Sequence, residues 1–443
     1  MMSQIHTFTR QQGEIQRVQL VRLDSWEQLE AFSPTPSASA LQCFGDIYQS
    51  YLIPACPWVF GNLVMFRLPE GLQSLAMPGA GEDPLTAAAG MLRKHLRFAG
   101  KKPRIRDAQT RKLWEALERD GCIRTVRGKL PITTIIPVAD RSGFLTESMP
   151  SAAMKVNGSF FIMDPFDCAT VYDHVGNCFG LYVRRGVVER PPLYGREALL
   201  VKKDGSVCVS SPDLRQLTVR IGACSFVAGE NAVVFTRPQR AWTPGGKQKK
   251  LVIVGRRVEA VYPQGRAPIP ASGFVLAVDP DCQVQAGDTV TYLGMEDVVF
   301  GIQVGNSIVR DGVATMEFKS RFYNIRALQP VPYPPCLYPL KFHASRAARI
   351  ALGADGEGKP MLLWAEGAAK LGHIPGVDSC GATLAEMAQI CMELGMVNAV
   401  NLDGGGSAQI LLHGHRGLCI SDRNGDDHSE SERPVPMGLC VKE

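Results

Sequence analysis

The sequence lacks paired cysteine motifs. Its 13 cysteines are an odd number, and no two of them form a Cys-x-x-Cys pair. Zinc sites and disulfide frameworks both depend on regular cysteine spacing, so the pattern favours neither. We therefore expect mostly reduced thiols, as in a protein of the reducing cytosol.

Long apolar runs are lacking as well. No stretch of about 18 consecutive apolar residues is present to span a membrane. Residues 1–7 also lack the apolar segment of a secretory signal. We expect no membrane span and a cytoplasmic location.

The chain has little excess charge of either sign. It contains 48 Lys and Arg against 43 Asp and Glu, a formal net charge of +5 over 443 residues. Nucleic-acid-binding proteins usually concentrate basic residues on one face, so we expect no nucleic-acid partner, although a weak bias toward anionic substrates is compatible with this charge. With 45% hydrophobic residues the chain can bury a large core, which is typical of a soluble enzyme of two or three domains.

Residues 401–407 read Asn-Leu-Asp-Gly-Gly-Gly-Ser and carry the most information. The apolar residues before and after them, 397–400 and 408–412, predict two short strands. Asp403 is therefore expected at a strand end that is open to a ligand, followed by glycine N–H groups that can approach it closely. A plain tight turn is the alternative. No Lys-Ser or Lys-Thr follows, so the segment is not a phosphate-binding P-loop.

A helix is predicted just before this loop. Thr383-Leu384-Ala385-Glu386 forms a capping box, and apolar residues then recur at helical spacing up to Gly395. The capping role accounts for Glu386 without any part in catalysis.

Elsewhere the sequence predicts an α+β fold. Residues 84–98 and 107–121 have helical patterns, and residues 250–254, 274–278 and 288–293 resemble strands. The proline-rich segment 329–339 resembles a linker or a surface strap. We expect a smaller α/β N-terminal accessory domain at 1–140, and a catalytic domain of mixed β-sheet with flanking helices at 141–443.

Several segments resemble the phosphodiester glycosidase family, and they occur in the family's order. The resemblance covers roughly residues 150 to 443, and the glycine loop with its preceding helix is the most specific part. The matching segments are Asn157-Gly158-Ser159-Phe160-Phe161, residues 349–353, residues 379–388, residues 401–407 and Glu432-Arg433-Pro434-Val435-Pro436.

The resemblance implies hydrolysis of a glycosyl phosphodiester without an organic cofactor. The substrate would be a small molecule or oligosaccharide that carries a sugar phosphate. Asp403 is the candidate base or nucleophile, and Arg349 and Arg433 are candidates for a clamp on the phosphate. Each arginine could instead form a structural salt bridge. Further candidates for substrate binding are Asn157, Asn401, Gly404, Gly405, Gly406, Ser407 and Glu432.

Two positions depart from the family pattern. Ile350 stands where a threonine is expected, and Ala368 stands where an arginine is expected. A lost hydroxyl and a lost cation should change how the substrate is held. The alternatives are a glycosidase acting on a non-phosphorylated glycan, or a glycan-binding or assembly protein with reduced catalysis.

Metal binding is left open by the sequence. Residues 422–428 resemble a calcium loop only superficially, because the spacing to a bidentate glutamate is missing. His413-Gly414-His415 would place two imidazoles on one strand face, a pattern that is more often incidental than a ligand set. The oligomeric state cannot be read from the sequence.

Overall fold

A computed structural model gives the arrangement of the chain. The structure describes residues 2–9, 14–49, 62–100, 102–127, 133–149, 151–163, 168, 170–193, 195–237, 240–305, 307–315, 346–367, 374–417, 423–424, 429–430 and 432–442. The proline-rich segment 329–339 and Ala368 lie outside these residues. Strands dominate the described residues and the helices are few, which confirms the α+β prediction in outline.

The sheet that carries the candidate site is named here after β24. Its strand order is β1-β2-β25-β24-β26-β22-β23, and its ladders are antiparallel. The strands are β1 (Met2–Thr9), β2 (Ile15–Arg22), β25 (Pro360–Ala365), β24 (Arg349–Ala354), β26 (Asn398–Asn401), β22 (Ser307–Arg310) and β23 (Val313–Ala314). Every residue of β24, β25 and β26 is buried, so this sheet is covered on both faces.

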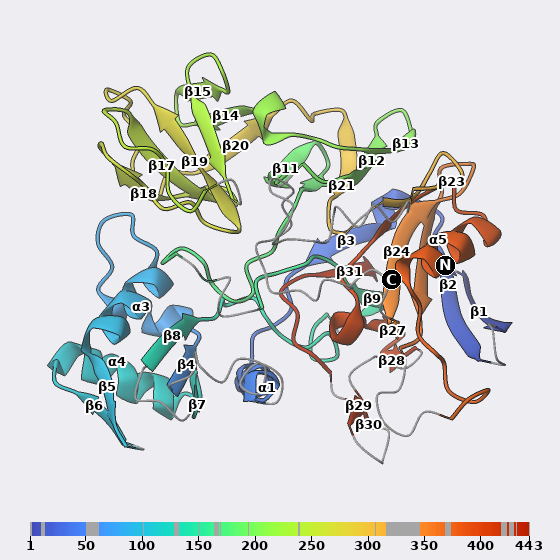
Figure 1. The fold of residues 1–443 in the computed structure, drawn as a ribbon, viewed down its shortest axis with the longest axis horizontal. Coiled ribbons are helices and arrows are strands. Elements are labelled where there is room, and N and C mark those ends of the chain that lie inside the picture. The colour runs from blue at the N-terminus through green and yellow to red at the C-terminus, as the bar shows by residue number, and fades with distance from the viewer. Residues whose placement is uncertain are drawn as a thin grey trace.

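Helix α5 (Leu384–Glu393) covers one face of the β24 sheet (Figure 1). Its apolar side packs Met387, Ile390 and Cys391 against Leu20 and Leu363. The capping box predicted at Thr383 and Glu386 is present. The helix prediction is confirmed, and the helix leads directly into β26.

A second sheet, named after β9, packs on the other face of the β24 sheet. One core cluster joins Val156, Ile410 and Leu439 of this sheet to Leu352 and Val400 of the β24 sheet. The order is β28-β27-β9-β31-β3, with β28 (His415–Arg416), β27 (Ile410–Leu412), β9 (Ala152–Asn157), β31 (Gly438–Lys442) and β3 (Leu29–Phe32). The glycine loop thus crosses from one sheet to the other.

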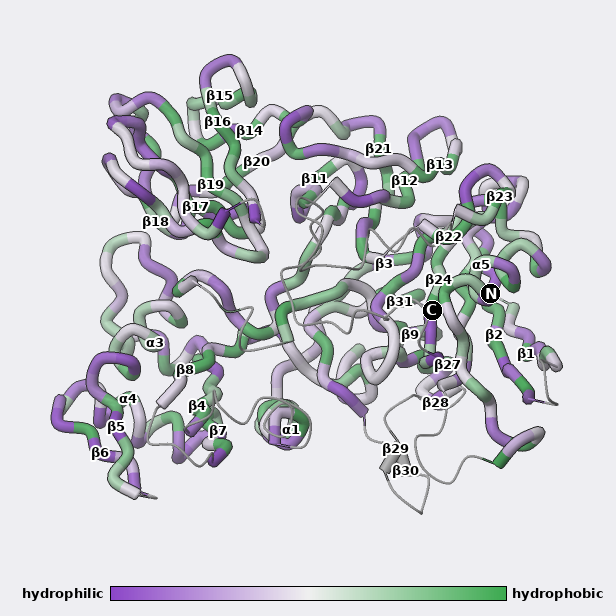
Figure 2. The backbone as a smooth tube through the Cα atoms, in the orientation of Figure 1, coloured by the Kyte–Doolittle hydropathy of each residue, from purple (hydrophilic) through white to green (hydrophobic). Residues whose placement is uncertain are grey.

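The middle of the chain forms smaller antiparallel sheets, drawn in green to yellow in Figure 1. One contains β10 (Tyr182–Arg184), β11 (Val187–Arg190), β12 (Ala198–Lys202), β13 (Val207–Ser210) and β21 (Val298–Ile302). Another contains β14 (Thr218–Ile221), β15 (Cys224–Val227) and β20 (Val290–Leu293), and a third contains β16 (Val233–Thr236), β17 (Lys249–Val254), β18 (Arg257–Tyr262) and β19 (Gly273–Val278). The strands predicted at 250–254, 274–278 and 288–293 are present as β17, β19 and β20. In Figure 2 the tube along β19 is largely hydrophobic, as expected for a buried central strand.

Residues 62–137 form a small α/β unit. Its elements are β4 (Asn62–Phe66), α3 (Pro84–His95), β5 (Leu96–Ala99), β6 (Lys102–Ile105), α4 (Ala108–Arg119), β7 (Ile123–Val126) and β8 (Thr133–Pro137). The helices predicted at 84–98 and 107–121 are confirmed, with Asp83 and Asp107 as their N-caps. The first helix ends three residues early because residues 96–99 turn into a strand.

The first strands of the chain do not stay within this α/β unit. Strand β2 pairs with β25, β3 pairs with β31, and helix α1 (Ala38–Ile47) follows them. Residues before 33 therefore complete both sheets of the candidate site. The domain boundary at residue 140 stays a prediction. Among the described residues, no helix is long and apolar enough to cross a membrane.

Candidate functional site

Strand β26 places Asp403 where the two large sheets meet. β26 pairs with β24, and this pairing continues one residue past β26. There the Leu402 N–H donates a hydrogen bond to the Ile350 carbonyl, at 2.8 Å. The Asp403 N–H then donates to the carbonyl of Gly158, at 3.2 Å. Asp403 is only 7% exposed, so it is more buried than the open strand end that the sequence predicts. The second sheet covers it.

Gly404 and Gly405 let the loop backbone pack closely against Ala348 and the Asp403 carboxylate. The Gly404 N–H donates to the Asp403 carboxylate at 3.0 Å, and the Gly405 N–H donates to the Ala348 carbonyl at 2.7 Å. Gly405 has a φ of 64°, a left-handed conformation that favours glycine. A Cβ on Gly404 would lie 2.9 Å from the Ala348 oxygen. Two of the three amides expected to face a ligand are thus used to hold the loop and its carboxylate.

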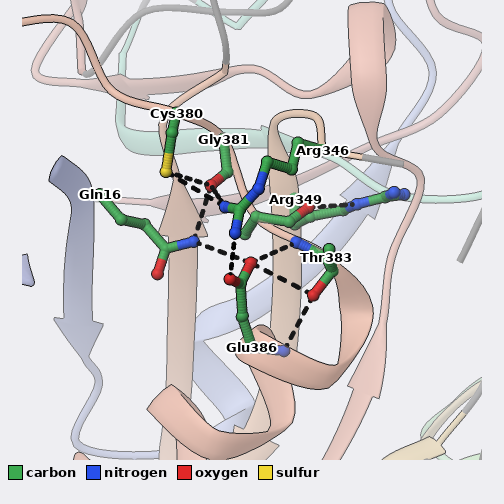
Figure 3. Close-up of polar contacts among 8 residues, drawn as sticks. Gln16, Arg346, Arg349, Cys380, Gly381, Thr383 and Glu386 are labelled. Atoms are coloured by element: carbon green, nitrogen blue, oxygen red, sulfur yellow. Dashed lines mark hydrogen bonds and ion pairs between the residues drawn. The ribbon is translucent and has the colours of Figure 1, made fainter. Parts of the chain in front are cut away.

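The two candidate arginines both lie beside this loop. Arg349, at the start of β24, is fully buried, and its Nε donates to the Ala382 carbonyl at 3.2 Å (Figure 3). The Arg349 guanidinium lies next to the loop, since a Cβ added to Gly404 would lie 3.7 Å from one of its Nη atoms. Arg433 contacts Ser407 at the end of the loop, with 3.5 Å between its Nη1 and the serine Oγ. The structure therefore brings together two cations that are far apart in the sequence.

This setting changes the ionisation of Asp403. Burial raises its pKa to about 7, against the opposing effects of Arg433, Ser407, Gly404 and Arg349. Desolvation dominates because removing a carboxylate from water costs more than these partners return. A carboxyl group with a pKa near neutrality can exchange a proton under ordinary conditions, as a general acid or base must.

Asn157 positions the loop. Its amide Nδ2 donates to the Asp403 carbonyl at 2.8 Å, and its Oδ1 accepts the Gln409 N–H at 2.8 Å. The side chain is buried. These contacts support a role for Asn157 in orienting Asp403.

Asn401 is different. Its side chain is fully buried, and neither its Oδ1 nor its Nδ2 has a hydrogen-bond partner among the described residues. Its backbone carbonyl accepts the Gly305 N–H at 2.9 Å, and a Cβ on Gly305 would lie 2.8 Å from the Asn401 Nδ2. An unsatisfied buried amide is costly. Asn401 therefore remains a candidate for a ligand contact.

Glu432 points away from its neighbour Arg433, as expected for adjacent residues in an extended segment. Its carboxylate accepts the Thr146 N–H at 3.1 Å and pairs with Arg416 at 3.1 Å. These contacts indicate a structural role rather than a place in the substrate site.

Glu386 is held by the cap of α5 (Figure 3). It accepts the Thr383 N–H at 2.9 Å and pairs with Arg346 at 2.5 Å. Burial alone would raise its pKa, but the hydrogen bond from the Thr383 N–H and the charge of Arg346 lower it overall. These contacts keep the glutamate ionised, and its predicted capping role is confirmed.

Ile350, which replaces the expected threonine, faces the apolar core between the sheets. Successive residues of a strand point to opposite faces, so Ile350 points away from Arg349. An apolar side chain at this position therefore packs in the core, where a threonine hydroxyl would need a hydrogen-bond partner.

The prediction that His413 and His415 share a strand face is wrong. His413 and Gly414 have φ angles of 47° and 79° and form the turn between β27 and β28, in which Leu412 pairs with His415. Such a turn suits a hairpin but breaks the alternation of a strand. Within the described residues, no group of three metal-binding side chains occurs. The acidic residues between 422 and 428 lie outside the described part of the chain.

Gln409 is a site residue that the sequence analysis missed. Its Nε2 donates to the Arg433 carbonyl at 2.7 Å, and its backbone N–H binds Asn157. It therefore links the segments of Asn157 and Arg433 to the loop. A polar residue within an apolar strand pattern was the available signal.

Residues 227–442 match the family model described as phosphodiester glycosidase. This region, just under half of the chain, is similar to that family. The match includes Asp403, Arg349 and Arg433 and confirms the resemblance inferred from the motifs.

Curated relatives of this family match a shorter stretch. The mouse (Mus musculus) N-acetylglucosamine-1-phosphodiester alpha-N-acetylglucosaminidase is 37% identical over 103 residues, which is 23% of this chain and 18% of the relative. The human (Homo sapiens) enzyme of the same name is 36% identical over 103 residues, with the same shares. The chain thus spans about a fifth of the length of the curated relatives it matches.

Solved structures with distant similarity include two examples. The zebrafish N-acetylglucosamine-1-phosphodiester alpha-N-acetylglucosaminidase catalytic domain, auto-inhibited by its pro-peptide, is 14% identical with a TM-score of 0.40, covering 100% of this chain and 83% of that one. A hypothetical protein from Synechocystis is 19% identical with a TM-score of 0.37, covering 68% of this chain and 53% of that one.

Proposed function

We propose that the protein is a hydrolase that cleaves the anomeric C–O bond of a glycosyl phosphodiester, with Asp403 as the essential carboxylate. The observation that carries this proposal is the convergence of Arg349 and Arg433 on a buried aspartate whose pKa is raised to about 7. The match of residues 227–442 to the phosphodiester glycosidase family model, which includes all three residues, supports the proposal.

The proposed reaction needs few groups besides Asp403, Arg349 and Arg433. Water adds to the anomeric carbon, the bond to the phosphate oxygen breaks, and its electron pair leaves with a phosphate monoester. Because that leaving group is already acidic, it needs little protonation, and one carboxylate can serve as base or nucleophile. The guanidinium groups of Arg349 and Arg433 match phosphate oxygens in pairs and would hold the charge.

The first test is Asp403→Asn. This change keeps the size of the side chain and removes its charge and basicity. General acid or base catalysis contributes about 10²- to 10⁴-fold, so turnover of a sugar-1-phosphate diester, followed by release of the free sugar, should fall by at least that order. The matched control is Asp204→Asn, in an exposed turn before Gly205, which should keep the parent's turnover.

The folded state of each variant is checked by urea unfolding. Near-parental turnover in a folded Asp403→Asn variant would remove Asp403 from the mechanism. A parent that cleaves neutral p-nitrophenyl glycosides but no phosphodiester would replace the proposal with a glycosidase of non-phosphorylated glycans. A variant that unfolds would favour the tight-turn interpretation of the loop.

We also propose a cytoplasmic location. Five buried cysteines have free thiols, namely Cys122, Cys178, Cys380, Cys391 and Cys440. Cys224 and Cys282 lie within hydrogen-bond distance of each other, so this pair is the first that an oxidising compartment would cross-link. Intact-mass analysis after alkylation without reductant should find the thiols modified, whereas four or more protected cysteines would contradict this location.

A further inference from the structure

A separate cavity of about 520 Å³ lies between α3, β11 and the β17–β18 sheet. Asp83 lines it from the start of α3, Arg190 from β11 and Glu259 from β18. Its volume is in the usual range for small-molecule sites, about 300 to 1,000 Å³. Among its described lining residues are neither Asp403 nor the two arginines beside it.

Arg190 lines this cavity with a guanidinium group that neighbouring side chains hold in place. Its Nη2 donates to the Ser159 Oγ at 2.5 Å, and its guanidinium carbon lies 5.7 Å from the centre of the Tyr182 ring. Its Nε is buried and has no hydrogen-bond partner among the described residues. Burial lowers the pKa of Arg190, the direction expected for a cation that lacks a compensating carboxylate.

Arg141 lines the same cavity and adds a second positive charge. It lies close enough to Arg190 to lower the pKa of that residue further, and its charge also acts on His174 and Glu259. Among the described residues, neither Arg141 nor Arg190 has a carboxylate within ion-pair distance. Two guanidinium groups that line the same cavity can hold one phosphate group between them.

The other two arginines of the cavity are already paired. Arg256 pairs with Glu189 at 3.0 Å, and the Nε of Arg257 lies 3.9 Å from Glu259. They therefore add little free positive charge. The cationic character of the cavity is concentrated at Arg141 and Arg190.

Hydrogen-bond acceptors also line this cavity. Burial and the charge of Asp83 raise the pKa of Glu259 to about 7, so its carboxyl group can accept or donate a hydrogen bond. The Asp83 carboxylate also lines the cavity, although one of its oxygens is bonded to Thr86 at 2.8 Å. Asn177 adds an amide. Such groups suit hydroxyl groups on a ligand.

We propose that this cavity binds a small phosphate monoester that carries hydroxyl groups, with Arg141 and Arg190 holding the phosphate and Glu259 and Asp83 facing the hydroxyls. Two guanidinium groups match a dianionic phosphate in charge and in hydrogen-bond geometry. The site is distinct from the Asp403 site and does not depend on the proposed hydrolysis. Because Asp83, the N-cap of α3, lines the cavity, the N-terminal α/β unit takes a direct part in ligand binding.

The test is calorimetric titration of the full chain with glucose 6-phosphate, with inorganic phosphate and glucose as separate probes. We expect glucose 6-phosphate to bind more tightly than either part alone. Arg141→Gln and Arg190→Gln should each weaken its binding by about tenfold or more, because a charge-assisted hydrogen bond contributes about 1.5 to 3 kcal/mol. Arg220→Gln is the matched control, since Arg220 is exposed on β14 and does not line the cavity.

Asp403→Asn separates the two sites. This variant should bind glucose 6-phosphate as the parent does, even if it has lost turnover. The proposal is overturned if the parent does not bind the probe, if Arg141→Gln binds it as tightly as the parent, or if Asp403→Asn abolishes binding. Arg141 is exposed, so its variant decides the matter if Arg190→Gln fails to fold.

Discussion

At the scale of single residues, the candidate site is governed by desolvation. Asp403 is buried where two sheets meet, and two arginines offset only part of the cost of its negative charge. The same balance recurs at Glu259, where burial also brings a carboxyl pKa to about 7. Carboxyl groups in such settings are typical of functional sites.

The pH dependence of turnover should report Asp403. A base or nucleophile acts in its ionised form, so kcat/KM should rise as the pH increases through about 7. Arg433 lowers the pKa of Asp403, and therefore Arg433→Gln should move this rise to higher pH. The measurement is a pH profile of kcat/KM for both proteins. A midpoint that stays in place would show that Arg433 does not act on the titrating group.

Stability should provide an independent check on the same group. The folded protein binds the Asp403 proton more tightly than the unfolded chain does, so this residue's contribution to stability is full below about pH 4 and is lost as the pH rises to about 7. Asp403→Asn lacks this loss. Urea unfolding should therefore show the variant gaining stability relative to the parent between these pH values.

At the scale of elements, α5 fixes the start of β26 and hence the loop. The helix begins with a reciprocal cap between Thr383 and Glu386, and its apolar side is buried against the β24 sheet. The Arg346 ion pair joins the chain before β24 to the same cap. The cap of α5 therefore fixes the positions of both β24 and β26, the two strands that lead to the site.

Removal of this cap should affect stability rather than chemistry. Thr383→Ala should lower the free energy of unfolding by about 0.5 to 2 kcal/mol, the usual effect of losing an N-cap. The kcat of the folded enzyme should not change, because Thr383 and Glu386 bond to each other. Urea unfolding and initial rates on the same preparation would measure both.

The control lies at the other end of the same helix. Glu393 is exposed in the last turn, where a negative charge is unfavourable for the helix dipole. Glu393→Ala should therefore cost no stability. A loss of turnover in folded Thr383→Ala, with normal turnover in the control, would argue for a catalytic role of the cap.

At the scale of the whole molecule, the α/β unit is packed against the middle sheets at one tight contact. Gly81 lies just before α3, and a Cβ on it would lie 1.9 Å from the backbone oxygen of Ala286. Arg257 donates to the Gly81 carbonyl at 3.0 Å across the same contact. Arg257, which makes this contact, also lines the cavity that contains Arg141 and Arg190.

Gly81→Ala should loosen the attachment of the α/β unit. The alanine would meet backbone that cannot move aside cheaply, and it would also adopt a φ of 73°. Limited proteolysis should become faster between the α/β unit and the middle sheets. Gly100→Ala is the matched control, since its φ of 62° imposes the same backbone strain with nothing within 4 Å. Equal rates of proteolysis in the two variants would show that the Gly81 contact does not hold the α/β unit against the middle sheets.

The sequence by itself determined the local elements. Helices α3, α4 and α5 and strands β17 and β19 follow from apolar spacing and caps, which are encoded within a few neighbouring residues. The glycine loop and its aspartate were also recognisable, because glycine runs are rare and specific. The same local reasoning failed at His413-Gly414-His415, where a turn replaced the predicted strand.

Only the tertiary structure decided which distant residues meet. It buried Asp403 between two sheets, brought Arg349 and Arg433 to the same loop, and used two glycine amides to hold that loop. It also completed both sheets with strands from the first 32 residues. Strand pairing between distant segments depends on the packing of the whole core, which the local pattern of a segment does not encode.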